Sequence, residues 1–196
     1  MGATAKTYLL RLAFCSLLGA PLAASALLNI DGTRNQVFVF GEVVMNYDSN
    51  VFSQKNGTGD YSSTASVGFE LKRRAGIISV NARVVFDYIR FARITGQNAW
   101  NPSVYLEFDK TTGRTTGAFT VNAYRSAQAD SAVNLRTTSW NYPLGLSLKY
   151  PVNDHVYVTS QSGYLSQRFV NNTALSNYYD YSEGLDMFYV YTSKLD

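Results

Sequence analysis

The sequence predicts an all-β protein, namely an antiparallel up-and-down transmembrane β-barrel with about eight strands present in the chain. Three observations predict it. Segments of about ten residues alternate apolar and polar side chains, which is long enough for a tilted strand to cross a bilayer. The connections between these segments alternate between short and long. Within the segments, the charged residues fall almost entirely on one parity, that is, on the alternate positions that share one face of a strand.

Residues 1–26 have the pattern of a secretory signal peptide. Lys6 and Arg11 provide a basic start, an apolar core follows, and Ala24-Ser25-Ala26 is a small-x-small cleavage site. The apolar core is shorter than the roughly 18 residues that a membrane-spanning helix needs. We therefore expect export, with a periplasmic lead over residues 27–36 of the mature chain.

Residues 37–196 form the predicted barrel, and its clearest strand pair runs from Tyr61 to Tyr88 around a tight basic turn at Lys72–Gly76. Mostly apolar side chains occupy odd positions before the turn and even positions after it. Successive side chains of a strand point to opposite faces, so each run has one apolar and one polar face. The eight expected strands cover residues 37–52, 61–72, 78–88, 99–109, 115–126, 137–150, 155–167 and 178–191.

The connections give a second signal. Three are short, at residues 72–76, 110–114 and 151–154. Three are longer, at residues 92–98, 127–136 and 169–177, and the first, at 53–60, is intermediate. Short periplasmic turns alternating with longer external loops are typical of an outer-membrane barrel whose N-terminus lies in the periplasm.

Charge and aromatic placement agree with a lipid-facing wall. An Arg or Lys that faces lipid at mid-depth costs roughly 2–4 kcal/mol, so one face should exclude charge. Arg90 and Arg125 lie near predicted strand ends, Glu183 breaks the rule, and aromatic residues gather near strand ends as in interfacial girdles. A secreted β-sandwich would show the same alternation. The candidates for lining a lumen are Glu42, Asp48, Glu70, Arg83, Asp87, Glu107 and Lys149.

Several functions are disfavoured by composition. The chain has 17 basic and 14 acidic residues, two of the basic ones in the predicted signal, so the mature chain is nearly neutral and shows no nucleic-acid signature. His155 is the only histidine and follows Asp154 in a predicted turn, with no nucleophile beside it. We expect no enzyme, no cofactor and no metal site. The single cysteine, Cys15, lies in the predicted signal, so disulfides are not expected.

The segment Tyr47-Asp48-Ser49-Asn50-Val51-Phe52, with the tyrosine-rich hairpins after it, resembles the beta-barrel porin-2 group of bacterial outer-membrane proteins. Members of that group are typically much longer. The end of this sequence, Thr192–Asp196, also lacks the terminal aromatic strand usual in outer-membrane barrels. Either eight strands close into a small barrel, or the sequence is the N-terminal part of a larger one, which we favour.

Together these patterns predict an outer-membrane conduit for the passive diffusion of small hydrophilic solutes, with outer-membrane lipid and the barrel-insertion machinery as partners. A homo-oligomer is an expectation by analogy with porins alone. The alternatives are a non-conducting structural or adhesive barrel and an outer-membrane component of polysaccharide export. The native strand number and the solute stay open.

Overall fold

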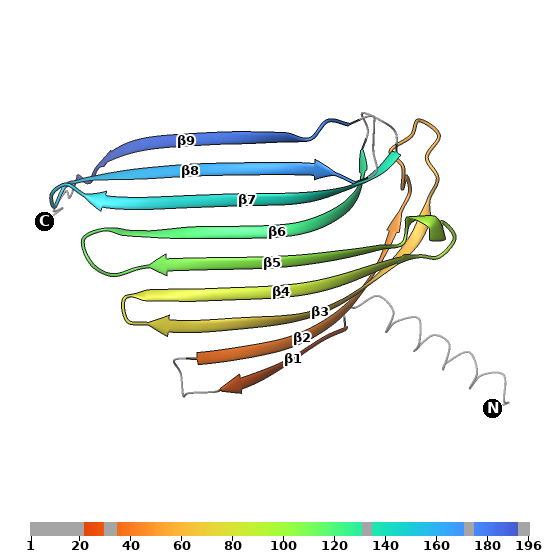
Figure 1. Ribbon diagram of the computed structural model, residues 1–196, viewed down its shortest axis with the longest axis horizontal. Coiled ribbons are helices and arrows are strands. Elements are labelled where there is room, and N and C mark those ends of the chain that lie inside the picture. The colour runs from red at the N-terminus through yellow and green to blue at the C-terminus, as the bar shows by residue number, and fades with distance from the viewer. Residues whose placement is uncertain (1–21, 30–34, 131–134, 171–174, 192–196) are drawn as a thin grey trace, which may run out of the picture.

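The computed structural model describes residues 22–29, 35–130, 135–170 and 175–191. These residues form a single antiparallel sheet in which every strand pairs with its neighbours in the sequence, so that the order is β1 to β9 (Figure 1). The strands are β1 (Leu22–Asn29), β2 (Asn35–Asp48), β3 (Asp60–Ala75), β4 (Ile78–Phe91), β5 (Ala99–Lys110), β6 (Thr116–Asp130), β7 (Leu135–Pro151), β8 (Val156–Phe169) and β9 (Tyr178–Tyr189), with one 3-10 turn, η1 (Thr95–Gln97). The all-β, antiparallel up-and-down fold is therefore confirmed.

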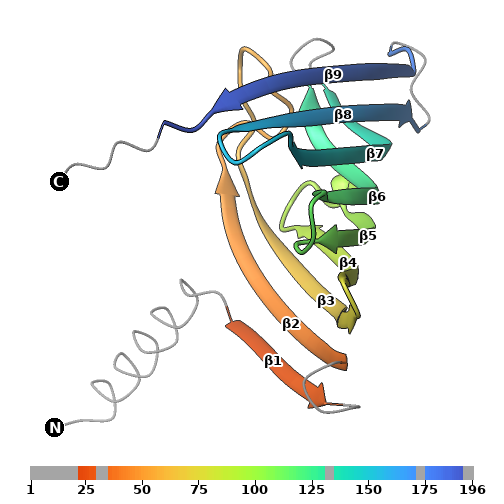
Figure 2. The same ribbon diagram turned by 90° about the vertical axis from the view of Figure 1, so that its left-hand side faces the viewer.

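The sheet curves into an arc with two free edges. Figure 2 shows the arc rising from β1 to β9 and opening on one side. Within the described residues no pairing joins β9 to β1, so the sheet is not closed. Among these same residues, no helix is both long and apolar enough to cross a membrane.

The eight expected strands correspond to β2–β9, with two corrections at their borders. The long connection expected over residues 127–136 is shorter, because β6 runs on to Asp130 and β7 begins at Leu135. Conversely, the first connection is longer than expected, since β2 ends at Asp48 and β3 begins at Asp60. The alternation of short and long connections thus fails at the β6–β7 connection and holds elsewhere.

A further strand, β1, precedes the first strand that the sequence predicted. It pairs with β2 in register from Leu22 opposite Val43 to Asn29 opposite Gln36. Its sequence, LAASALLN, does not alternate, which is why it resembled only a signal segment. The predicted lead over residues 27–36 is thus partly strand, and β1 also crosses the predicted cleavage site after Ala26. Residues 1–21, with most of the predicted signal, lie outside the described part.

The short turns are set by local backbone chemistry. Gly76, between β3 and β4, has φ +63°, a left-handed conformation that glycine adopts without a steric penalty. The turn between β7 and β8 is held by Asn153, whose Oδ1 accepts hydrogen bonds from the backbone N–H groups of His155 and Val156 at 2.9 and 2.8 Å. We call this side of the sheet the turn end, and the opposite side the loop end.

Candidate functional site: the concave face and the loop end

The concave face of the sheet carries a large hollow. This cavity has a volume of about 840 Å³ and is lined by polar-parity side chains of β2 to β6, joined by Arg125 from the other parity of β6. Four of the seven predicted lumen residues lie in its wall: Glu42, Glu70, Arg83 and Asp87. These four residues therefore share one face of the sheet, and whether that face lines a lumen stays a prediction.

Strand register arranges the cavity wall in two rows. The acidic row crosses four strands, with Glu42 opposite Ser66, Ser66 opposite Asp87, and Asp87 opposite Asn101. Every side chain in this row ends in oxygen or an amide, and none is basic. β3 lies between the strands that carry the two carboxylates of this row. Since neighbouring strands are about 4.8 Å apart, the backbones of Glu42 and Asp87 are about 10 Å apart.

The mixed row lies closer to the turn end. In it Glu70 stands opposite Arg83, Arg83 opposite Tyr105, and Tyr105 opposite Asn122. The Arg83 guanidinium also lies over the ring of Phe40, 4.7 Å from the centroid. The asparagines and tyrosine of the two rows were not singled out from the sequence, although their parity is that of the predicted charges and could have found them.

The other three predicted lumen residues lie elsewhere. Glu107 lines a second hollow of about 270 Å³ near the turn end, together with Lys72 and Asp109. Lys149 lies on β7 toward the turn end, with its Nζ 4.0 Å from the centroid of the Tyr157 ring. Asp48 is at the loop end of β2. The predicted set is therefore spread along the length of the sheet and does not form one cluster.

The convex face is apolar and uncovered. Met45, Phe69 and Val104, from three different strands, have exposed fractions of 54%, 50% and 50%. At the loop end this face carries tight aromatic pairs, with ring centroids 4.8 Å apart for Tyr47 and Tyr61. The corresponding separation for Tyr88 and Trp100 is 4.6 Å. An exposed apolar face of this kind marks a surface that a partner protein, a ligand or a membrane covers.

Glu183, which broke the parity rule, finds one partner. It stands opposite Ser162 in the β8–β9 register, and the Ser162 hydroxyl donates a hydrogen bond to Glu183 Oε1 at 3.2 Å. The carboxylate thus has a cross-strand donor on an edge strand.

At the loop end, the Tyr47–Phe52 motif folds the start of the β2–β3 connection. The Asp48 carboxylate accepts the Asn50 N–H at 2.8 Å, and the Asn50 side chain bonds both N–H and C=O of Gln54. Val51 N–H donates to Thr58 O at 3.0 Å, and the Val51 side chain is fully buried. The motif that carried the family resemblance therefore acts here by ordering a loop.

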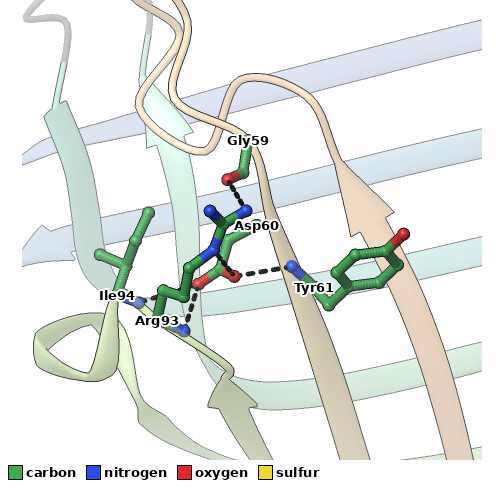
Figure 3. A network of polar contacts seen from close by, with 5 residues as sticks. All are labelled: Gly59, Asp60, Tyr61, Arg93 and Ile94. Carbon is green, nitrogen blue, oxygen red and sulfur yellow. Dashed lines mark hydrogen bonds and ion pairs between the residues drawn. The ribbon is translucent and has the colours of Figure 1, made fainter.

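A buried carboxylate joins this connection to the next one on the same side of the sheet. Asp60 is fully buried and accepts the N–H groups of Tyr61, Arg93 and Ile94 at 2.8, 2.9 and 2.8 Å (Figure 3). Arg93 adds an ion pair, Nε to Oδ1, at 3.6 Å and donates from Nη2 to Gly59 O at 3.4 Å. We call these contacts the Asp60 latch.

The contacts of the Asp60 latch lower the pKa of the Asp60 carboxyl group. Burial alone would raise the pKa of Asp60, but the hydrogen bonds from Ile94, Arg93 and Tyr61, together with the Arg93 charge, outweigh it and leave the pKa below its ordinary value. Asp60 begins β3, whose 16 residues exceed the 9–11 that a tilted spanning strand needs. The latch therefore lies at the loop end of β3, away from the middle of the strand.

The residues considered for catalysis or metal binding remain apart. His155 is exposed in the β7–β8 turn, with its ring centroid 6.1 Å from that of Tyr189. Within the described ranges, no group of three or more His, Cys, Asp or Glu side chains could hold a metal ion.

Fold and faces define the class of this chain as a curved, antiparallel up-and-down β-sheet with an apolar convex face and a polar concave one. No protein-family model matches it, and neither a curated protein nor a solved structure shows detectable similarity to it. The resemblance to the porin-2 group accordingly stays a prediction.

Proposed function

We propose that the sheet is the wall of a porin-like β-barrel of the bacterial outer membrane, which lets small hydrophilic solutes diffuse along its concave face. One observation carries this proposal: the apolar side chains of β2–β9 face outward uncovered, while carboxylate, guanidinium, amide and hydroxyl groups line the inside. In water that arrangement would leave the apolar face exposed to solvent, which is unfavourable. In a bilayer it matches lipid on one side and solvent on the other.

The partners follow from the same two faces. Outer-membrane lipid covers the convex face, and hydrated solutes occupy the concave one. The barrel-insertion machinery, possession of a cleaved signal and homo-oligomerisation belong to the proposal as well, by analogy with outer-membrane barrels as a class.

The acidic row implies a preference among solutes. Glu42 and Asp87 stand in a row without a basic side chain. The whole cavity wall carries three carboxylates against the guanidinium groups of Arg83 and Arg125, a charge balance that favours cations. The mechanism is passive, because fixed charges bias which ions enter a hydrated path and no turnover occurs.

Planar-bilayer recording of the full chain, refolded in detergent, tests the function. We expect discrete conductance steps and a reversal potential in a KCl gradient that shows preference for K⁺. Asp87→Asn should weaken this preference, whereas Glu183→Gln, which removes one charge from β9 outside the cavity wall, should leave it unchanged. A protein that inserts into vesicles but never conducts would instead support the structural or adhesive barrel.

A further inference from the structure

Two side chains from strands that are not neighbours meet at the loop end. The guanidinium carbon of Arg136, at the start of β7, lies 5.0 Å from the centroid of the Phe91 ring, at the end of β4. β5 and β6 separate these strands, so a flat sheet would hold them about 14 Å apart. Only on the inside of a strongly curved sheet can such strands approach, so the Arg136 head group lies on the concave side.

A third strand reaches the same point. The Asp48 carboxylate, at the end of β2, is close enough to Arg136 for a favourable electrostatic interaction. Both views show the connection after β2 beside the loop-end tips of β6 and β7 (Figures 1 and 2). At the loop end, side chains of β2, β4 and β7 therefore come close to one another on the concave side.

The burial of side chains indicates that the space on the concave side is narrower at the loop end than in the middle of the sheet. The most buried side chains of the described residues lie at the loop end: Val51 at 0%, Phe91 at 3%, and Thr137, Ser139 and Asn141 of β7 at 6%, 3% and 5%. In the middle of the sheet the concave face is instead hollow, with the cavity of about 840 Å³. A path along the concave face would thus widen in the middle and narrow beside Arg136.

The Arg136 guanidinium makes only part of the hydrogen bonds that it could donate. Its Nη2 donates to the backbone oxygen of Ala127, but its Nε is buried without a hydrogen-bond partner. A buried donor without an acceptor costs free energy, so the side chain gains by moving toward an acceptor. A guanidinium is also the side chain best suited to pair with a carboxylate or phosphate group.

We infer that Arg136 is the selectivity residue of a constriction at the loop end, where its positive charge opposes the passage of cations and favours solutes that carry a carboxylate or phosphate. This inference rests on the proposed function. It adds a second charge filter, of opposite sign to the acidic row and at a different depth of the path.

Bilayer recordings of Arg136→Ala test the inference, with Arg168→Ala as the matched control. Arg168 lies opposite Trp140 near the same end of the sheet and is exposed, so its removal changes the net charge equally. We expect Arg136→Ala to raise the unit conductance and to shift the reversal potential further toward that of K⁺. Arg168→Ala should do neither. Arg136→Lys, which keeps the charge, should retain the wild-type reversal potential and guards against a loss of folding in the alanine variant.

The outcomes separate the two proposals. If the wild type conducts and Arg136→Ala behaves like Arg168→Ala, the constriction is wrong and the conduit stands. If the wild type is silent but Arg136→Ala conducts, the constriction is supported as a closed mouth. If all variants insert and none conducts, the conduit and the constriction both fail.

Discussion

The ring of Phe40 on β2 lies directly over Gly68 on β3, its partner in the register. A Cβ atom at position 68 would come within 2.2 Å of Phe40 Cζ, so the glycine leaves the space that the ring fills. The guanidinium group of Arg83 in turn lies over the Phe40 ring, 4.7 Å from its centroid. The absence of a side chain at Gly68 thus makes room for the Phe40 ring, over which the cavity-lining Arg83 guanidinium lies.

Gly68→Ala should therefore displace Phe40 and destabilise the sheet. Overpacking of this kind typically costs about 1–3 kcal/mol. Urea unfolding in detergent micelles, followed by tryptophan fluorescence, measures the change in the free energy of unfolding. Gly96→Ala is the control, because an added Cβ there has no neighbour within 4 Å. Equal effects of the two substitutions would contradict the packing argument.

A charge placed on the convex face should block insertion into lipid. Val104, in the middle of β5, is 50% exposed on that face, and the neighbouring Ser103 lines the concave cavity. We expect Val104→Arg to cost roughly 2–4 kcal/mol of stability in a bilayer, because the guanidinium would sit in hydrocarbon. Unfolding from phospholipid vesicles measures this cost.

Ser103→Arg is the paired control for that experiment. Its guanidinium would enter the hydrated side, so insertion should be nearly unaffected. If the two arginines were equally tolerated, or if the wild type stayed monomeric in water without detergent, the convex face would not be a lipid-facing surface.

Breaking the Asp60 latch should loosen both connections that it joins. In Asp60→Asn the carboxylate that accepts three backbone N–H groups is lost, so residues 49–59 and 92–98 should open more often. Limited trypsin digestion in micelles should then cut faster after Lys55 and Arg93 than in the wild type. Asp154→Asn, in an exposed turn at the other end, should leave both rates unchanged.

The latch should also respond to acid in a defined direction. Because the pKa of Asp60 is lowered in the folded chain, its contribution to stability is complete above the unfolded value of about 3.9 and is lost as the pH falls below it, through the folded pKa. Hydrogen exchange should show the protection of the Arg93 and Ile94 amides falling in that acidic range. Asp60→Asn should abolish this pH dependence, and a loss of protection at neutral pH in the wild type would contradict it.

The strands could be predicted from the sequence wherever one face is apolar and the other polar. In β7, Leu144, Leu146 and Leu148 alternate with Gly145 and Ser147, and side-chain parity alone fixes which residues share a face. The same rule placed Glu42, Glu70, Arg83 and Asp87 in the cavity wall. It could not say how far along the wall each lies, because that depends on register between strands.

What the sequence did not reveal depends on contacts between distant segments. The Asp60 carboxylate meets the amides of Arg93 and Ile94 across a strand pair, and nothing local to Asp60 indicates those donors. The contact of Arg136 with Phe91 requires curvature, which parity does not encode. β1 was missed because small and apolar residues without alternation fit an export signal as well as a strand.

The extra strand at the start of the sheet has a consequence for assembly. In an up-and-down sheet direction reverses at each step, so β1 and β9 run the same way and could not join each other as antiparallel partners. Proteolysis after Ala26 would leave only Leu27–Asn29 of β1, and the outermost full-length strands would become β2 and β9, which run oppositely. In the described sheet, removal of the predicted signal would therefore leave two edge strands that run in opposite directions.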